Sequence, residues 1–223
     1  MKKAILFILI LQSLVSIQAQ TGTPIYSITD GKISVDASKW VEPFDTTIDI
    51  SKNSYTRRGT ETFKINATSC TVEIGAVNDW EEIDETNFNT IAIYRNKQEP
   101  FTVKQLDCWT YTYGGDSTFD YSNVTDNRYF ITLASTETCK TLAFIGWPYG
   151  GELSLLTIIA VTEDDAKIVF NKHVVIRDIT DNGSQKNIKI QTLLEEYDSC
   201  GKLCVAPTYA TMIAKDGVLY WKE

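Results

Sequence analysis

The segment LSLLTIIAVTEDDAKIVFNKHVVI (residues 153–176) holds the clearest strand–turn–strand pattern in the chain. Leu153 to Val161 is almost continuously apolar, which is typical of a strand at the centre of a sheet with both faces covered. Glu163-Asp164-Asp165 then forms a polar turn, and Ala166–Phe170 returns to strand-like alternation. The pattern predicts two antiparallel strands, and we extend it to an antiparallel meander over residues 128–194.

The same texture continues on both sides of this segment. Runs rich in Thr, Ile, Val, Tyr and Phe suit a pleated, half-buried surface, and they recur about every ten residues. The expected strands are Thr60–Asn66, Thr71–Val77, Phe88–Arg95, Phe101–Leu106, Cys108–Tyr113, Thr118–Tyr121, Arg128–Ala134, Thr141–Trp147, Leu153–Thr162, Lys167–Asn171, His173–Ile179, Asn187–Leu194, Tyr209–Ala214 and Val218–Trp221.

Tight-turn dipeptides punctuate these runs. Asp30-Gly31 and Asp216-Gly217 each separate two alternating segments, and Asn182-Gly183 is a third hairpin candidate. Helix is expected only as a turn or two at Leu193–Asp198 or Trp80–Thr86. The sequence therefore predicts an all-β fold with little helix, an antiparallel β-sandwich or barrel built from hairpins and a meander.

The first nineteen residues have the order of a secretory signal peptide. Met1-Lys2-Lys3 is basic, residues 4–15 are apolar, and Ala19 is a small residue at the expected cleavage point. The apolar part is too short for a membrane-spanning helix, which needs about 20 residues. We expect residues 1–19 to be removed and residues 20–223 to form one secreted domain, periplasmic or extracellular.

The mature chain is acidic. Removal of residues 1–19 takes two of the 21 basic residues and none of the 29 acids, which leaves a net charge of −10. Such a charge argues against nucleic acid and anionic membranes as partners, because both are polyanions. No further apolar run is long enough to span a membrane. The oligomeric state is left open.

Aromatic residues are concentrated in two places. Strand periodicity places Trp109, Tyr111 and Tyr113 on one face, and we expect Tyr121 to pair with them across a turn that contains Asp116. Trp147 and Tyr149 form a second cluster. Exposed rings beside carboxylates suit a carbohydrate, whereas buried rings would simply fill a core. The candidate ligand-binding residues are Trp109, Tyr111, Tyr113, Asp116, Tyr121, Trp147 and Tyr149.

An acidic run offers an alternative. An exported inhibitor or immunity-type protein would bind a basic partner through such a loop, with a tryptophan as anchor. A solvated loop without a partner explains the same residues. The run comprises Asp79, Trp80, Glu81, Glu82, Asp84 and Glu85.

The five cysteines fit an oxidising compartment, and their odd number leaves at least one unpaired within the chain. Cys200 and Cys204 are closest in sequence and are the first candidates for a disulfide. One close cysteine spacing and a single histidine do not indicate a zinc site. The sequence predicts neither a metal nor a cofactor.

Catalytic signatures are scarce. His173 is the only histidine and lies in a predicted strand, and the chain has no Gly-x-Ser-x-Gly elbow, phosphate loop or His-Glu-x-x-His motif. A glycan hydrolase with a carboxylate pair stays open as an alternative, because it needs no histidine. Our leading expectation is a non-catalytic module that binds a carbohydrate or protein ligand through an aromatic patch.

Overall fold

A computed structural model describes residues 22–43, 54–78, 87–96, 98–110, 129–146, 153–183 and 186–223. This part of the chain is 74% strand and 3% helix, with antiparallel sheets consistent with a β-sandwich. The prediction of an all-β fold is confirmed. The predicted signal peptide, residues 1–19, lies outside the described residues. No helix among those described is long and apolar enough to cross a bilayer.

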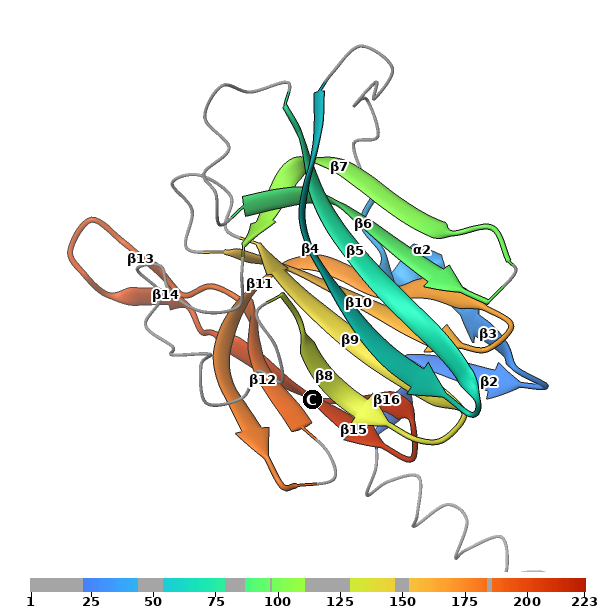
Figure 1. Ribbon diagram of the computed structural model, residues 1–223. Helices are drawn as coiled ribbons and strands as arrows, with labels where there is room; N and C mark the ends of the chain where they lie inside the picture. Colours follow the sequence, from blue (N-terminus) through green and yellow to red (C-terminus); the bar gives the residue numbers. More distant parts are fainter. Residues whose placement is uncertain are drawn as a thin grey trace, which may run out of the picture.

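One twelve-stranded sheet dominates the described chain (Figure 1). The strands run in the order β1-β16-β15-β12-β11-β10-β9-β7-β6-β5-β4, and β8 pairs with β9. Their bounds are β1 Thr23–Pro24, β4 Ser54–Ile65, β5 Thr68–Asn78, β6 Asn87–Arg95, β7 Phe101–Thr110, β8 Ile131–Ser135, β9 Cys139–Gly146, β10 Ser154–Thr162, β11 Ala166–Asp181, β12 Lys186–Leu193, β15 Thr208–Lys215 and β16 Val218–Lys222.

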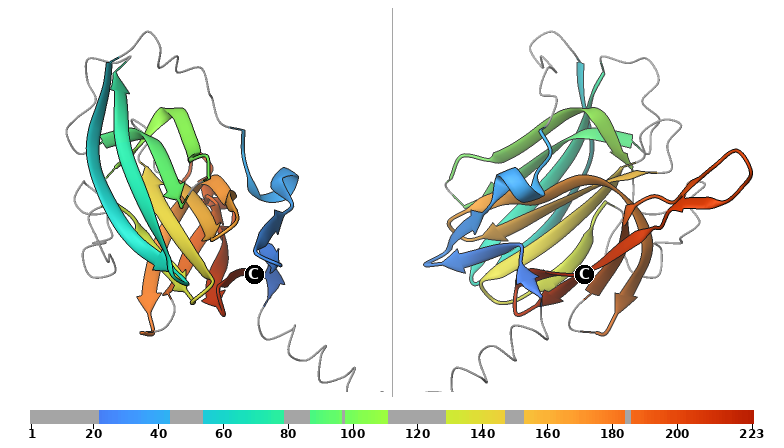
Figure 2. Two further views of the ribbon diagram at one scale, coloured as in Figure 1. Left: turned by 45° about the vertical axis from the view of Figure 1, so that its right-hand side comes forward. Right: turned by 180° about the vertical axis from the view of Figure 1, so that it is seen from behind.

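Three small elements complete the fold. The hairpin of β2 (Tyr26–Thr29) and β3 (Lys32–Val35) leads into the short helix α2 (Ala37–Trp40). A second hairpin, β13 (Glu196–Tyr197) and β14 (Leu203–Val205), projects from the body (Figures 1 and 2), and we call it the arm. The helix predicted at Leu193–Asp198 is wrong, because this backbone is extended and pairs as β13 with β14.

Strand β10 is buried along its whole length and separates two hydrophobic cores. Leu156 and Ile158 face core A, which also receives β12, β15, β16 and the β2–β3–α2 segment. Leu155 and Ile159 face core B, which lies beneath β5, β6 and β7. The left view of Figure 2 shows β4 and β5 on one side of the molecule and β2–β3 on the other. The expected central, doubly covered strand is confirmed.

Strand β11 joins the two parts of the sheet. Ala166 to Val174 pairs with β10, whereas Val175 to Asp181 pairs with β12 after the partner changes. The sequence predicts two strands here, Lys167–Asn171 and His173–Ile179. The structure has one continuous strand, whose pairing partner changes from β10 to β12. The register shift between Ile176 and Asp178 is a bulge that bends the strand at this corner.

The predicted Asp-Gly hairpins are present. Asp30 and Gly31 have φ values of 48° and 74°, and Asp216 and Gly217 have 51° and 78°. Two successive positive φ values are the requirement of a type I′ turn. These turns set the registers of β2 with β3 and of β15 with β16.

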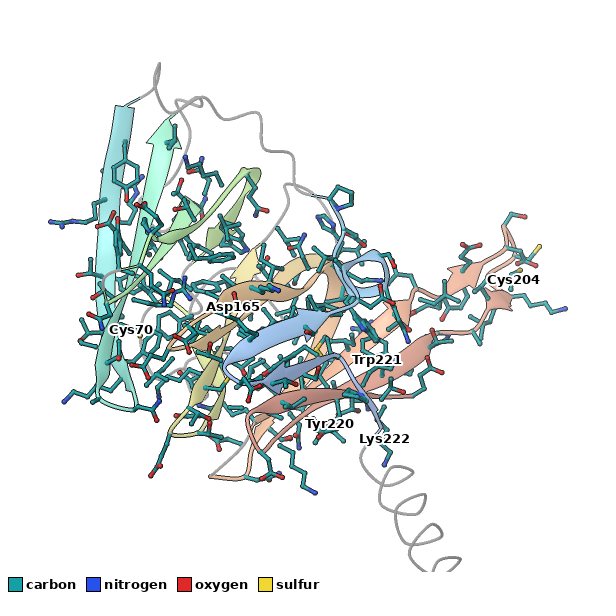
Figure 3. The ribbon with its side chains drawn as sticks, turned by 90° about the vertical axis from the view of Figure 1, so that its right-hand side faces the viewer. Cys70, Asp165, Cys204, Tyr220, Trp221 and Lys222 are labelled. Carbon is teal, nitrogen blue, oxygen red and sulfur yellow. The ribbon has the colours of Figure 1, made fainter. Side chains whose placement is uncertain are left out.

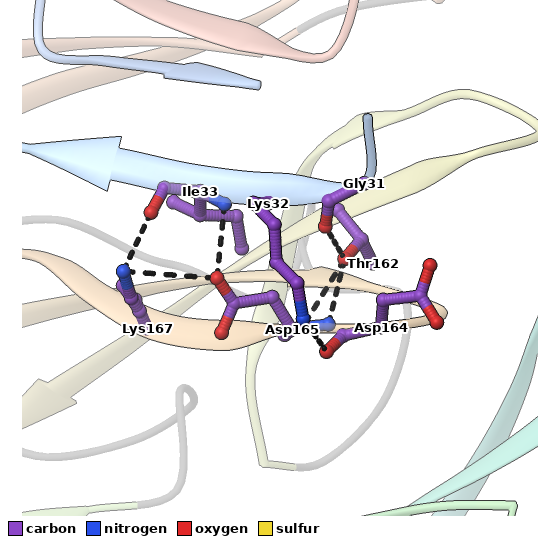
Figure 4. A network of polar contacts seen from close by, with 7 residues as sticks. All are labelled: Gly31, Lys32, Ile33, Thr162, Asp164, Asp165 and Lys167. Atoms are coloured by element: carbon purple, nitrogen blue, oxygen red, sulfur yellow. Dashed lines mark hydrogen bonds and ion pairs between the residues drawn. The ribbon is translucent and has the colours of Figure 1, made fainter. Parts of the chain in front are cut away.

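The β2–β3 hairpin is fastened to the β10–β11 turn by polar contacts (Figure 4). The Asp165 carboxylate accepts the Ile33 N–H at 2.9 Å and lies 3.7 Å from the Lys167 ammonium. Lys167 in turn donates to the Ile33 carbonyl, and the Thr162 hydroxyl donates to the Gly31 carbonyl. The acidic turn read from the sequence therefore attaches the N-terminal hairpin to the main sheet.

Candidate functional site

Trp109 does not lie on an exposed aromatic patch. It is 0% exposed, and its ring stacks on Phe88 with centroids 5.8 Å apart in core B. Its Nε1–H donates to the Thr157 hydroxyl at 2.8 Å. A ring that is buried and hydrogen-bonded in this way is part of the core, which corrects its predicted role as a ligand-stacking residue. The other candidates, Tyr111, Tyr113, Asp116, Tyr121, Trp147 and Tyr149, lie outside the described residues.

A chain of hydrogen bonds runs from Trp109 to the surface. Thr157 donates to the Asn171 side-chain oxygen at 2.7 Å, and the Asn171 amide donates to the Glu42 carbonyl at 3.2 Å. Glu42 Oε2 lies 3.1 Å from His173 Nδ1. In this structure the single histidine therefore holds the segment after α2 against β11.

The acidic run of the alternative hypothesis also lies outside the described residues. This applies to Asp79, Trp80, Glu81, Glu82, Asp84 and Glu85.

The predicted Cys200–Cys204 disulfide is absent from the arm, since both thiols are free and exposed. The turn is closed instead by Asp198, whose Oδ1 accepts the N–H groups of Cys200 and Lys202 at 2.9 Å each. Cys204 lies beyond this turn, on β14, and Figure 3 labels it on the projecting arm. Of the other described thiols, Cys70 and Cys139 are buried.

Two exposed tyrosines instead lie on β4 and β6, the strands on either side of β5. Tyr55 is 39% exposed and Tyr94 is 42% exposed, although both belong to regular strands. The Tyr55 hydroxyl donates to Glu73 Oε1 at 2.7 Å. We call these three residues the tyrosine platform.

Registry places the platform residues on one face of the sheet. In β5, Val77 is opposite Tyr55 and Thr71 is opposite Tyr94. Thr71, Glu73 and Val77 are separated by even numbers of residues along β5 and therefore lie on the same face. Residues two apart in a strand share a face, so the three platform side chains project to the same side. The opposite face of β5 carries Val72 and Ile74, which are buried in core B.

Gly75 allows the Tyr55 ring to lie close against the sheet. A Cβ atom at Gly75 would meet the ring of Tyr55 at 2.3 Å. A glycine within a strand often marks such a close approach. Because the ring covers Gly75 and its hydroxyl is bonded to Glu73, its orientation is fixed before any ligand arrives.

Electrostatics keep the Tyr55 hydroxyl protonated as a donor. Burial of the hydroxyl raises the pKa of Tyr55 above its usual value, and the hydrogen bond to the Glu73 carboxylate raises it further. Nearby Tyr94 also raises the pKa of Tyr55, whereas nearby Arg57 lowers it. Tyr94 and Arg57 are thus close enough to act on the same site.

Polar side chains surround the rings. Arg57, Thr60 and Thr62 of β4 are exposed, and register pairs them with Gly75, Glu73 and Thr71 on the platform face. The site therefore offers aromatic faces, one carboxylate, one guanidinium and a row of hydroxyls. Such a set can make apolar contacts and directional hydrogen bonds at the same time.

Sequence reasoning missed this site because the expected strand began at Thr60. Tyr55 and Arg57 lie before it, in the part of β4 that precedes the register shift between Arg57 and Gly59. The available signal was Gly75 inside an otherwise regular strand, which indicates that another group approaches the backbone. Comparison of the chain with protein-family models, with curated proteins and with solved structures finds no match.

Proposed function

We propose that this protein is an exported, non-catalytic binding protein that holds a carbohydrate on the tyrosine platform. The observation that carries the proposal is the Tyr55 ring, which lies over Gly75, is anchored to Glu73 and remains 39% exposed. An exposed aromatic side chain normally samples several rotamers, and fixing one of them on binding costs conformational free energy. Here that ordering is already complete in the free protein.

The chemistry of the platform suits a sugar. The C–H faces of a pyranose ring are apolar and can stack on Tyr55 and Tyr94, whose rings combine an apolar face with a polar tip. Glu73 and the threonine hydroxyls can bind the equatorial hydroxyls, which both donate and accept hydrogen bonds. The exposed rings of Tyr55 and Tyr94 remain available to a ligand that approaches from outside the sheet.

Calorimetric titration with soluble oligosaccharides of cellulose, xylan, mannan and galactan tests the proposal. We expect at least one series to bind, and Tyr55→Ala and Tyr94→Ala each to weaken that binding by tenfold or more, about 1.4 kcal/mol. Tyr209→Ala is the matched control, because Tyr209 is 45% exposed but belongs to β15. It should leave the affinity unchanged.

Three results would overturn the proposal: no binding across the four series, equal binding by wild type and both platform variants, or release of new reducing ends by the purified protein. The last result would favour a glycan hydrolase. Export is tested separately by sequencing the N-terminus of the protein recovered outside the cytoplasm, where we expect Gln20 to be first.

A further inference from the structure

A guanidinium and a carboxylate lie near each other at the tyrosine platform without forming an ion pair. Arg57 of β4 is opposite Gly75 of β5, and Glu73 is two residues from Gly75 on the same face. Such diagonal neighbours on adjacent strands (Figure 1) are about 7–8 Å apart, within reach of long side chains. Within the described chain no ion pair joins Arg57 to Glu73. Both groups are therefore available to one ligand.

The Arg57 guanidinium is exposed beside the Tyr55 hydroxyl. Its positive charge lowers the pKa of Tyr55, an effect that requires the two groups to be close. Its side chain forms neither a hydrogen bond nor an ion pair with any described residue. An arginine side chain has five N–H donors and no acceptor. These donors can reach an oxygen atom of a ligand that stacks on Tyr55.

The Glu73 carboxylate has one bonded oxygen and one free oxygen. Oε1 accepts the Tyr55 hydroxyl at 2.7 Å, and no described residue donates to Oε2. The residues opposite Glu73 on the two neighbouring strands, Thr60 and Ala92, carry no charge. Because Oε1 is held by the Tyr55 hydroxyl, Oε2 has a defined place beside the Tyr55 ring. It is an acceptor without a donor.

A donor and an acceptor at this spacing match two neighbouring hydroxyl groups of a sugar. Each hydroxyl can donate and accept, so one can accept from Arg57 while the next donates to Glu73. Two hydrogen bonds of about 2.8 Å, together with the gap between the two hydroxyls, span more than the ~4 Å of a direct ion pair. The separation of the two side chains therefore fits a bridging diol.

We propose that Arg57 and Glu73 select a sugar unit with two free neighbouring hydroxyls, which they bind while the same unit stacks on Tyr55. Arg57 donates to one hydroxyl oxygen, and Glu73 Oε2 accepts from the next hydroxyl. The inference rests on the proposed carbohydrate-binding function and defines its ligand class as pyranoses with an unsubstituted vicinal diol. Methylation of both hydroxyls would keep the stacking face and remove the donor to Glu73.

Calorimetric titration with cellotetraose, mannotetraose and β-1,4-galactotetraose tests this selection. Each parent sugar is compared with its 2,3-di-O-methyl derivative, which lacks free vicinal hydroxyls, and with its 6-O-methyl derivative, which keeps them. For the parent that binds most tightly, we expect the 2,3-di-O-methyl derivative to bind about tenfold more weakly, because hydrogen bonds to charged groups are lost. The 6-O-methyl derivative should bind like the parent.

Charge-removing variants test the two residues. Arg57→Gln and Glu73→Gln should each weaken binding of the parent about tenfold and leave the residual binding of the 2,3-di-O-methyl derivative unchanged. The amide oxygen introduced at position 73 can still accept the Tyr55 hydroxyl, so the ring stays anchored. Lys64→Gln is the matched control, because it removes a positive charge from the same strand, opposite Ser69 and away from Gly75. It should leave binding unchanged.

The inference is overturned if the 2,3-di-O-methyl derivative binds as tightly as the parent, if the 6-O-methyl derivative loses affinity to the same extent, or if both Arg57→Gln and Glu73→Gln bind the parent like wild type. Thermal melting checks the fold of each variant, and the ligand comparison uses the wild-type protein alone. In these cases parent binding that is lost in Tyr55→Ala leaves the platform proposal standing. If no parent sugar binds, both proposals fail.

Discussion

Gly75 controls the conformation of the tyrosine platform. In Gly75→Ala the new methyl group would overlap the Tyr55 ring at 2.3 Å, so the ring must swing off the sheet and lose its bond to Glu73. We expect a tenfold loss of sugar affinity with a change in unfolding free energy of only about 1 kcal/mol, the value of one hydrogen bond. A crystal structure and calorimetry of the variant check this. Sugar affinity like that of wild type would contradict a pre-set ring.

Buried Cys139 makes the protein sensitive to alkali. It is 1% exposed, and burial raises its thiol pKa from 9.0 to about 11. Between these pH values the unfolded chain releases a proton that the folded chain retains, so stability present below pH 9 declines as the pH rises to 11. The contribution is at most about 3 kcal/mol.

Urea denaturation at pH 8, 9, 10 and 11 measures this loss. Cys139→Ala should show a smaller decline than wild type over the same interval. Some decline will persist, because burial also raises the pKa values of Cys70 and Tyr26. Parallel curves for wild type and Cys139→Ala would show that this thiol does not contribute.

At the scale of elements, Asp165 attaches the β2–β3 hairpin to the main sheet (Figure 4). Its carboxylate accepts the Ile33 N–H and faces Lys167, with 18% of the side chain exposed. Asp165→Ala leaves that N–H without its acceptor, which should cost about 1–3 kcal/mol. Hydrogen exchange at Ile33 should accelerate correspondingly.

The neighbouring Asp164→Ala is the matched control, because the Asp164 contact to Lys32 uses its backbone carbonyl. Exchange at Ile33 should stay at the wild-type rate in this variant. Equal acceleration in both variants would assign the effect to the turn and its overall charge, and would remove the specific role of Asp165.

Sequence patterns predicted the elements better than their pairing. Asp30-Gly31 and Asp216-Gly217 specify hairpins locally, because the turn itself demands positive φ. The length of β11 was not predictable in this way, since its continuity depends on exchanging β10 for β12 as neighbour. Local propensity likewise allowed a helix at Leu193–Asp198, and pairing with residues 203–205 prevents it.

At the scale of the whole molecule, β9 and β10 couple the two cores. Leu155 packs in core B and Leu156 packs in core A, so neither core can separate without disrupting β10. We expect one cooperative unfolding transition. Leu155→Ala and Leu156→Ala should each destabilise the protein by about 2–5 kcal/mol and should lower the same transition. Calorimetry together with circular dichroism and tryptophan fluorescence tests this, and two separate transitions would contradict it.

The candidate site was harder to predict than the fold because it depends on how strands distant in sequence pair. Alternation showed that Trp109 and Tyr111 share a face, but not which face, because that depends on strands distant in sequence. In the structure, Trp109 points into core B and contacts Phe88 and Phe144. Tyr55 stayed outside since Gly75, twenty residues later, leaves room for its ring. Pairing between strands, and not composition, decided which aromatic side chains are accessible.

The antiparallel pairing of Thr23 with Trp221 brings Gly22 and Glu223 to the same end of the β1–β16 pair. If Gly22 and Glu223 were pulled apart, for example with optical tweezers, the hydrogen bonds between β1 and β16 would break one after another and not all at once. The β1–β16 pair would therefore open at low force, well before the central strands yield.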